Sequence, residues 1–339
     1  MDFLCKQQIE SCHQLQTVNY KLIMKIAIDM MGGDFAPLEA VKGIEDYLQN
    51  NNPDTTLFLI GDETIIKKLI TEHNISEETL QIIHASEIIE MHEHPTKALK
   101  EKKDSSIAIG FHLLATGKAD AFISAGNTGA MMVGALFSIK AIEGILRPTI
   151  GAYLPREDGT LGLLVDVGLN GDCKPENLSQ FALLGSLFAK HILGNDEPHV
   201  GLINLGAEEG KGNILTQAAY PILKGNKQIN FIGNIEGRDL LSGKAEVMVC
   251  EGFTGNVLLK FAESIYDIVK RREINDEHFN RFNFEIYGGV PVLGVNKPVI
   301  IGHGISHAIA FKNMILMAEK MLEKDLTGKI KSSLMEAVL

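Results

Sequence analysis

The sequence lacks several features that would each signal a class of protein. Its 339 residues include no tryptophan and only four cysteines, Cys5, Cys12, Cys173 and Cys250. These cysteines form no C-x-x-C pair and no cluster spaced like metal ligands, so we expect reduced thiols in a cytoplasmic protein. No run approaches the roughly 18–20 apolar residues of a membrane helix, and the first residues show no apolar core of a signal peptide.

Positive charge is also scarce. The 32 lysines and arginines are outnumbered by 43 aspartates and glutamates, which leaves a net charge of −11. A general nucleic-acid binder needs a positive surface, so this class is disfavoured. An anionic substrate must then be held by local groups, since the overall field of the protein would repel it. A hydrophobic fraction of 45% with 22% charged residues is ordinary for a globular protein.

We expect one structured domain. The first strand-like segment begins at Met24-Lys25, which leaves residues 1–23 as an N-terminal extension outside the fold. A single α/β catalytic domain is predicted over 24–325, with a short polar surface excursion around 262–286. Residues 326–339 are predicted to be a C-terminal tail.

Short β-branched apolar runs alternate with longer helical segments along this domain. Strands are predicted at 25–29, 56–60, 79–83, 121–124, 150–153, 162–166, 200–204, 229–232, 247–250 and 299–301. Helices are predicted at 38–48, 105–116, 128–139, 175–191, 213–222, 255–269 and 306–321. Continuous apolar strands between amphipathic helices indicate a parallel sheet covered on both faces. The predicted fold is therefore a layered α/β/α, Rossmann-like arrangement.

Glycine-rich or polar turns follow several of these strands directly. They lie at 30–34, 125–129, 167–170, 205–206 and 251–256. In open α/β sheets, ligands bind outside the carboxyl ends of the strands, where helix N-termini also point. We therefore expect these turns to converge on one site.

The turn that holds Gly126, Asn127, Thr128 and Gly129 is the first candidate. Small residues let backbone N–H groups approach an anion, and Asn or Thr adds side-chain donors. The alternative is a tight turn with Asn127 or Thr128 as a helix cap. Gly255 and Asn256 lie in a turn of the same kind, with the same two interpretations.

The turn with Gly32, Gly33 and Asp34 follows the first strand. Asp29 and Asp34 bracket it, an awkward setting for a bare phosphate. The pair would suit a metal-bridged anion, a basic partner or hydrogen bonds to a hydroxyl.

Two basic residues are candidates for phosphate binding. Lys211 lies at a helix start and could act as a point charge, or simply be solvated. Arg238 lies in a Gly-flanked turn and could bind a phosphate or an internal carboxylate equally well.

His303 lies between Gly302 and Gly304 at a strand end. This placement suits proton transfer or polarisation of a carbonyl, although a structural histidine is an equal alternative. Asn170 lies in another polar turn, between Asp166 and Asp172. These two aspartates could bind a metal together, or Asp172 could cap the following helix. Cys173 has no histidine in a partner motif, so a packed thiol is its default interpretation.

A basic run precedes the helix predicted at 105–116. It comprises Lys97, Lys100, Lys102 and Lys103. The run is either a docking surface for an acidic partner or a solvated helix end.

Taken in order, these segments resemble the PlsX family of phosphate acyltransferases. The resemblance covers 24 to about 322, and its strongest stretches are 24–34, 102–106, 118–130, 166–176, 211–213, 233–239, 252–260 and 287–289. Two loops differ: the family reads Gly-Ala-Asn-Val-Asp where this chain has 168–172, and His-Gly-Ser-Ser-Asp where it has 303–307. The excursion before Tyr287 is also shorter than in relatives.

The resemblance implies a reaction and its partners. An acyl carrier protein thioester and inorganic phosphate would give acyl phosphate for phosphatidic acid synthesis, with a glycerol-3-phosphate acyltransferase downstream. It further implies a homodimer, a fold like isocitrate and isopropylmalate dehydrogenases and phosphotransacetylases, no cofactor or metal, and a cytoplasmic location with at most peripheral membrane contact.

The predicted chemistry is direct attack by bound phosphate, because phosphate is already nucleophilic and a thiolate leaves readily. His303, Asn127, Asn170 and Lys211 are the predicted catalytic residues. The predicted phosphate- or substrate-binding residues are Gly32, Gly33, Asp34, Gly126, Thr128, Gly129, Arg238, Gly255 and Asn256.

Three other functions compete with this prediction. They are a phosphotransacetylase-like enzyme that uses acyl-coenzyme A, a nicotinamide-dependent dehydrogenase and a non-catalytic carrier-binding protein. The absence of a G-x-G-x-x-G with its downstream acid counts against the dehydrogenase, and the many polar turns count against a non-catalytic protein.

Overall fold

The computed structural model describes residues 23–50 and 54–336. Nearly all of the expected extension at 1–23 lies outside these residues. The strands are β1 Met24–Asp29, β2 Thr55–Gly61, β3 Leu80–His84, β4 Ala121–Ser124, β5 Thr149–Pro155, β6 Leu161–Val165, β7 His199–Ile203, β8 Asn230–Ile235, β9 Val247–Val249, β10 Val290–Leu293 and β11 Val299–Ile301.

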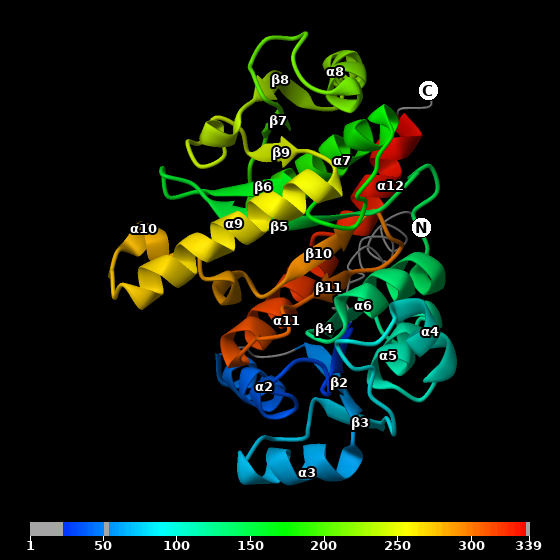
Figure 1. Ribbon diagram of the computed structural model, residues 1–339. Helices are drawn as coiled ribbons and strands as arrows, with labels where there is room; N and C mark the ends of the chain where they lie inside the picture. The colour runs from blue at the N-terminus through cyan, green and yellow to red at the C-terminus, as the bar shows by residue number, and fades with distance from the viewer. Residues whose placement is uncertain (1–22, 51–53, 337–339) are drawn as a thin grey trace, which may run out of the picture.

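Helices cover both faces of the sheet (Figure 1). They are α2 Leu38–Asn50, α3 Glu63–Glu72, α4 Pro95–Glu101, α5 Ser106–Ala115, α6 Thr128–Gly134, α7 Pro175–Phe188, α8 Ile214–Gly225, α9 Gly252–Arg271, α10 Glu277–Asn280, α11 Ala308–Glu323 and α12 Leu326–Glu336. Short π segments, η1 Ala135–Ile139 and η2 Ala189–Leu193, extend α6 and α7, and two 3₁₀ turns are η3 Gly237–Asp239 and η4 Phe284–Tyr287.

One continuous sheet joins all eleven described strands, in the order β3-β2-β1-β4-β11-β10-β5-β6-β9-β7-β8. The expectation of a parallel sheet is wrong at its centre. β10 runs antiparallel to both β11 and β5, and β6 runs antiparallel to β5. The four strands from β6 to β8 therefore run opposite to β1, β4 and β11. The carboxyl ends of the two groups lie at opposite edges of the sheet.

Two apolar layers sandwich the sheet, as the continuous apolar strands predicted. In β1, Ile26 and Ile28 join the layer under α2, α7 and α11, while Ala27 joins the layer under α5 and α6. All three side chains are fully buried. The layered α/β/α expectation is confirmed.

The carboxyl-terminal third differs from expectation in detail. α9 is longer than predicted and lies across β5 and β6 in Figure 1. Leu326–Glu336, within the segment predicted to be a tail, forms α12, with Leu326 and Ile330 buried in the core.

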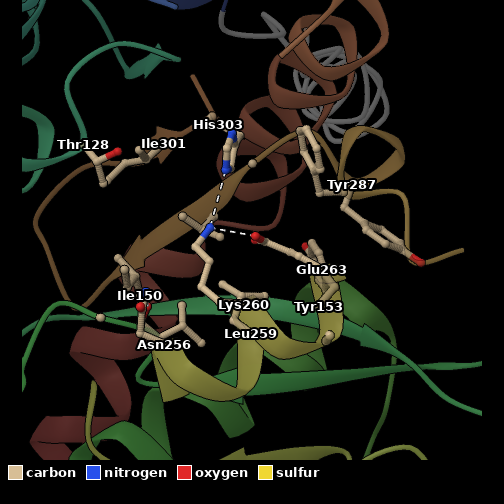
Figure 2. Close-up of a pocket in the computed structure, with 18 of the residues that line it drawn as sticks. Thr128, Ile150, Tyr153, Asn256, Leu259, Lys260, Glu263, Tyr287, Ile301 and His303 are labelled. Atoms are coloured by element: carbon tan, nitrogen blue, oxygen red, sulfur yellow. Dashed lines mark hydrogen bonds and ion pairs between the residues drawn. The ribbon is translucent and has the colours of Figure 1, made fainter. Parts of the chain in front are cut away.

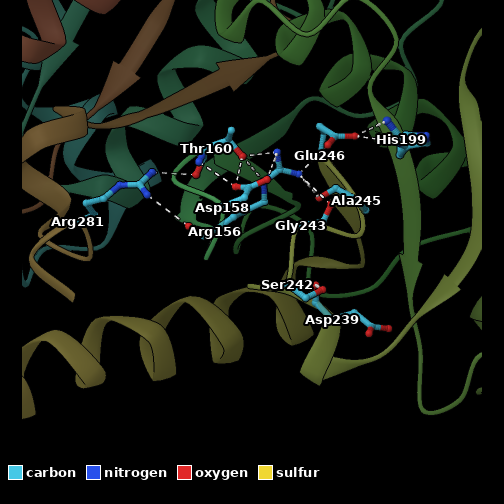
Figure 3. A network of polar contacts seen from close by, with 10 residues as sticks. All are labelled: Arg156, Asp158, Thr160, His199, Asp239, Ser242, Gly243, Ala245, Glu246 and Arg281. Carbon is cyan, nitrogen blue, oxygen red and sulfur yellow. Dashed lines mark hydrogen bonds and ion pairs between the residues drawn. The ribbon is translucent and has the colours of Figure 1, made fainter. Parts of the chain in front are cut away.

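An ion-pair network centred on the buried Arg156 ties the β5–β6 hairpin to its neighbours (Figure 3). Arg156 donates from Nη1 to Glu246 Oε1 at 2.7 Å and from Nε to Thr160 Oγ1 at 2.7 Å. Arg281, from the excursion after α10, donates to the carbonyl oxygen of Thr160 at 2.8 Å. His199 Nδ1 lies 3.0 Å from the second oxygen of Glu246. The Arg156 network thereby fixes the base of the excursion.

Candidate active site

A cavity of about 360 Å³ lies between α9 and the central strands β5, β10 and β11 (Figure 2). Turns from both halves of the sheet border it. The lining includes Met91, Thr128, Met132, Ile150, Ala152, Tyr153, Leu154, Val167, Gly168, Asn256, Leu259, Lys260, Ala262, Glu263, Phe282, Phe284, Tyr287, Val290, Ile301, Gly302, His303 and Gly304. The cavity is predominantly apolar, and its charged side chains are confined to α9 and the turn after β11.

The apolar wall comes from β5 and from the excursion. Ile150, Ala152 and Leu154 alternate along β5 and belong to the same apolar layer. Tyr287 faces Tyr153 with ring centroids 5.2 Å apart, and burial raises the pKa of both phenols. Such a wall suits an extended hydrocarbon chain, because it removes apolar surface from water.

The polar end brings His303 close to two residues of α9 (Figure 2). Lys260 Nζ lies 2.7 Å from Glu263 Oε2 and 3.5 Å from His303 Nε2. Burial and the Lys260 charge lower the pKa of His303, which favours a neutral imidazole. The backbone N–H of Ile305 points at His303 Nδ1 at 3.4 Å. If Nδ1 accepts this bond, the proton sits on Nε2 and faces the cavity, and Nε2 then accepts no hydrogen bond from the Lys260 ammonium.

Helix spacing explains why α9 presents these groups together. Asn256, Lys260 and Glu263 are four and three residues apart, so they share one face. A close approach seats the helix: a Cβ added to Gly255 would lie 1.7 Å from the carbonyl oxygen of Asp166. This packing lets Asn256 Nδ2 donate to the carbonyl oxygen of Val167 at 3.2 Å.

The side chain of Asn127 is occupied by backbone partners. Its Oδ1 accepts from Ala130 N at 2.9 Å and caps α6, while Nδ2 donates to the carbonyl oxygens of Glu90, Met91 and Glu93. Asn127 thereby holds Met91 at the cavity while Thr128 lines it. Its catalytic role stays a prediction.

The turns after β1 and β4 pack closely. Ser124 Oγ donates to Asp29 Oδ2 at 2.6 Å and accepts from Gly126 N at 2.9 Å. A Cβ on Gly32 would lie 2.4 Å from the same Asp29 oxygen. Asp29 is fully buried, and burial raises its pKa. Gly32 and Gly126 therefore allow the two turns to pack against each other.

Asp34 connects this junction to the His303 turn. Its backbone N–H donates to the carbonyl oxygen of Gly304 at 2.7 Å. Gly33, with φ +103°, makes the bend that precedes it. At α6, Gly129 leaves room for Pro95, whose Cγ would lie 2.3 Å from an added Cβ.

Asn170 and its neighbours form a second buried junction. Asn170 Nδ2 donates to Pro148 O at 2.8 Å and to Asp166 Oδ2 at 2.7 Å. Asp166 also accepts from several backbone N–H groups. Burial raises the pKa of the Cys173 thiol to about 11, which disfavours a thiolate nucleophile.

Lys211 and Arg238 lie away from the cavity. Lys211 is exposed in the turn after β7, and Arg238 pairs with Glu236 Oε2 at 2.8 Å with its side chain 78% exposed. The expectation that all the polar turns converge is therefore wrong for this region. Both turns follow β7 and β8, the last two strands at one end of the sheet, whereas the turns after β6 and β9 reach the cavity.

Lys260, Glu263 and the apolar wall were missed as site residues in the sequence. Lys260 lies within one of the family-like stretches, and its spacing from Asn256 was a usable signal. Among the described residues, no group of three His, Cys, Asp or Glu side chains could hold a metal ion. No helix in the described part of the chain is both long and apolar enough to span a bilayer.

Comparisons with known proteins show which family this chain resembles. A family profile described as "Fatty acid synthesis protein" matches residues 24–329. A phosphate acyltransferase of Dictyoglomus turgidum is 43% identical over 326 residues, covering 91% of this chain and 96% of that relative. One from Halothermothrix orenii is also 43% identical, covering 92% of this chain and 98% of its own length.

Solved structures show the same fold in more distant proteins. A phosphotransacetylase from Streptococcus pyogenes matches with a TM-score of 0.63 at 19% identity, covering 88% of this chain and 94% of its own. The EutD phosphotransacetylase from Staphylococcus aureus has a TM-score of 0.59 at 18% identity, with the same coverage. The level of identity to the relatives named above decides the family: this chain belongs to the phosphate acyltransferases and is an acyltransferase.

Proposed function

We propose that this chain transfers a fatty acyl group from acyl carrier protein to inorganic phosphate, giving acyl phosphate for phosphatidic acid synthesis. The observation that carries the proposal is a cavity with an apolar wall and a polar end where Lys260, His303, Thr128 and Asn256 meet. The wall suits the acyl chain, and the polar end suits the thioester and the phosphate.

The proposed reaction is a single displacement through a tetrahedral intermediate. A phosphate oxygen attacks the thioester carbon, the new C–O bond forms, and the C–S bond breaks. The carrier leaves as the thiolate, which then takes a proton from solvent. The raised pKa of Cys173 supports a route without an acyl-enzyme.

His303 is proposed to polarise the thioester carbonyl with its Nε2–H, and Thr128 and Asn256 add donors beside it. Preorganised donors of this kind stabilise the oxyanion. Asn127 and Asn170 are proposed to act by holding their turns in place. Lys211 and Arg238 can act on phosphate only if their turns move toward the cavity.

The proposal extends to partners and location. We propose a cytoplasmic homodimer that contacts membranes at most peripherally. A glycerol-3-phosphate acyltransferase would consume the acyl phosphate.

One assay tests the function. Purified protein is given phosphate and either acyl carrier thioester or acyl-coenzyme A, and acyl phosphate is trapped with hydroxylamine. We expect hydroxamate that depends on phosphate and forms faster from the carrier thioester. Faster turnover with acyl-coenzyme A would favour the phosphotransacetylase-like alternative. A thioester trapped on Cys173 would overturn direct attack.

A further inference from the structure

An anionic acceptor in this acidic protein needs a local cation. The net charge of −11 repels phosphate from the protein surface, so phosphate binding requires a local positive charge. Among the described residues that line the cavity, Lys260 is the only lysine or arginine. The two basic residues expected to bind phosphate, Lys211 and Arg238, are not part of that lining.

The surroundings of Lys260 leave it able to bind a further group. Its ammonium has three donor hydrogens, and Glu263 Oε2 at 2.7 Å is its one close acceptor. His303 Nε2 lies 3.5 Å away and, when it carries the ring proton, accepts no hydrogen bond from the ammonium. The Lys260 side chain is 51% exposed, so desolvation does not oppose its charge.

The neighbouring charges restrict where an anion can approach. Glu263 lies one turn further along α9, and the Asp34 carboxylate acts on His303 from the turn after β1. Both repel a phosphate. Thr128 and Asn256 line the cavity as neutral side chains with hydrogen-bond donors. The favourable approach is therefore on the side of Thr128, Asn256 and His303, away from the two carboxylates.

We propose that Lys260 is the residue that binds inorganic phosphate in the cavity, with Glu263 holding the ammonium toward His303 until the anion arrives. This assignment rests on the proposed use of phosphate as acceptor. It gives α9 a direct part in the reaction: Lys260 places the nucleophile beside the donors that face the thioester. Part of the charge that accumulates in the tetrahedral intermediate would also fall next to its ammonium.

Three variants test the assignment. Lys260→Met removes the charge and keeps a long side chain, while Lys260→Arg keeps the charge. Lys270→Met is the matched control, because Lys270 is an exposed lysine of the same helix outside the cavity lining. Circular dichroism checks that each variant is folded.

We expect Lys260→Met to raise the KM for phosphate by about 10- to 100-fold, the range for losing a charged hydrogen-bond partner. The KM for the acyl donor should stay within about threefold, Lys260→Arg should recover most of the loss, and Lys270→Met should match the parent. A phosphate KM unchanged in Lys260→Met, with activity retained, would overturn the assignment. Equal changes in both KM values would do so too.

Two measurements separate this assignment from the proposed function. Calorimetric titration with inorganic phosphate alone should show binding to the parent and to Lys270→Met, and much weaker binding to Lys260→Met. That result would hold even if the acyl donor or the reaction proved different. Equal binding to all three proteins would sink the assignment while leaving the assay of acyl transfer intact.

An NMR titration of His303 measures whether the Lys260 charge acts at this end of the cavity. A role of Lys260 in the fold alone would not change the pKa of His303. The Lys260 charge contributes to the lowered pKa of His303. Its removal in Lys260→Met should raise that pKa, while Lys260→Arg should leave it near the parent value. An unchanged pKa in Lys260→Met would show that the ammonium does not act on this end of the cavity.

Discussion

Two basic residues of this protein each pair with a glutamate, yet their surroundings differ completely. Arg156 pairs with Glu246 with its side chain 4% exposed, and further acceptors in the Arg156 network use its remaining hydrogens. Lys260 pairs with Glu263 with its side chain 51% exposed and one close acceptor. A buried cation whose hydrogen-bond donors are all used holds the fold together. An exposed cation with unused donors in a cavity can bind a ligand.

The largest expected effect comes from the buried pair. Arg156→Met should lower the free energy of unfolding by about 3 kcal/mol, because Glu246 loses its guanidinium partner and keeps only its contacts with His199. Urea denaturation measures this loss. The double variant Arg156→Met with Glu246→Leu should regain much of it. A single variant as stable as the parent would show that the Arg156 network is not structural.

At the cavity, the expected effect is on rate. His303→Ala should lower kcat by about 100-fold, within the range for removing one donor to an oxyanion. Its unfolding free energy should stay close to that of the parent. Steady-state assays with hydroxylamine trapping measure the rate. Near-normal turnover would remove His303 from the chemistry and leave it a structural residue.

The Arg156 network should also give a pH dependence to stability. Burial alone would raise the pKa of Glu246, but Arg156 and the backbone N–H of His199 hold it below its usual 4.5. The paired carboxylate therefore stabilises the fold above about pH 4.5, and this contribution is lost as the pH falls through the lowered folded-state value. In Glu246→Gln, urea midpoints should show a shallower decline between pH 5 and about 3. An identical decline would assign the acid sensitivity to other carboxylates.

The smallest expected effect is on the stability of the Lys260 variant. Lys260→Met should change the free energy of unfolding by no more than about 0.5 kcal/mol, because exposed ion pairs contribute little. Urea denaturation of this variant, beside Arg156→Met, places the two pairs on one scale. A loss of several kcal/mol would mean that Lys260 serves the fold, and its kinetic effects would then need reinterpretation.

Much of the fold could be read from local pattern. Strands such as Val200–Asn204 were predicted because buried strands are continuous apolar runs, and the structure has β7 at 199–203. Strand direction was not readable in this way. β10 was missed because it is four residues long and contains Pro291, and the direction of the strands from β6 to β8 is reversed by the antiparallel β5–β6 pair. The turns after β7 and β8 do not reach the cavity because these two strands lie at one end of the sheet.

Of the site, local sequence predicted the residues in turns but not the residues within α9. Thr128, Asn256 and His303 lie directly after strands or at helix starts, where position in sequence implies position at an edge. Lys260 and Glu263 lie within a helix, and their importance depends on which face of α9 meets β5. That contact is set by Gly255 against the Asp166 turn, a long-range fit that no local pattern specifies.

The place of β11 in the sheet has a consequence for synthesis on the ribosome. β11, at Val299–Ile301, lies between β4 and β10, so the amino-terminal strands lack a neighbour until nearly the whole chain has emerged. The edge of β4 would remain open during most of translation, and such open edges invite pairing with other chains. Completion of this half of the molecule must therefore await the synthesis of β11, and long-range pairing of this kind makes for slow folding.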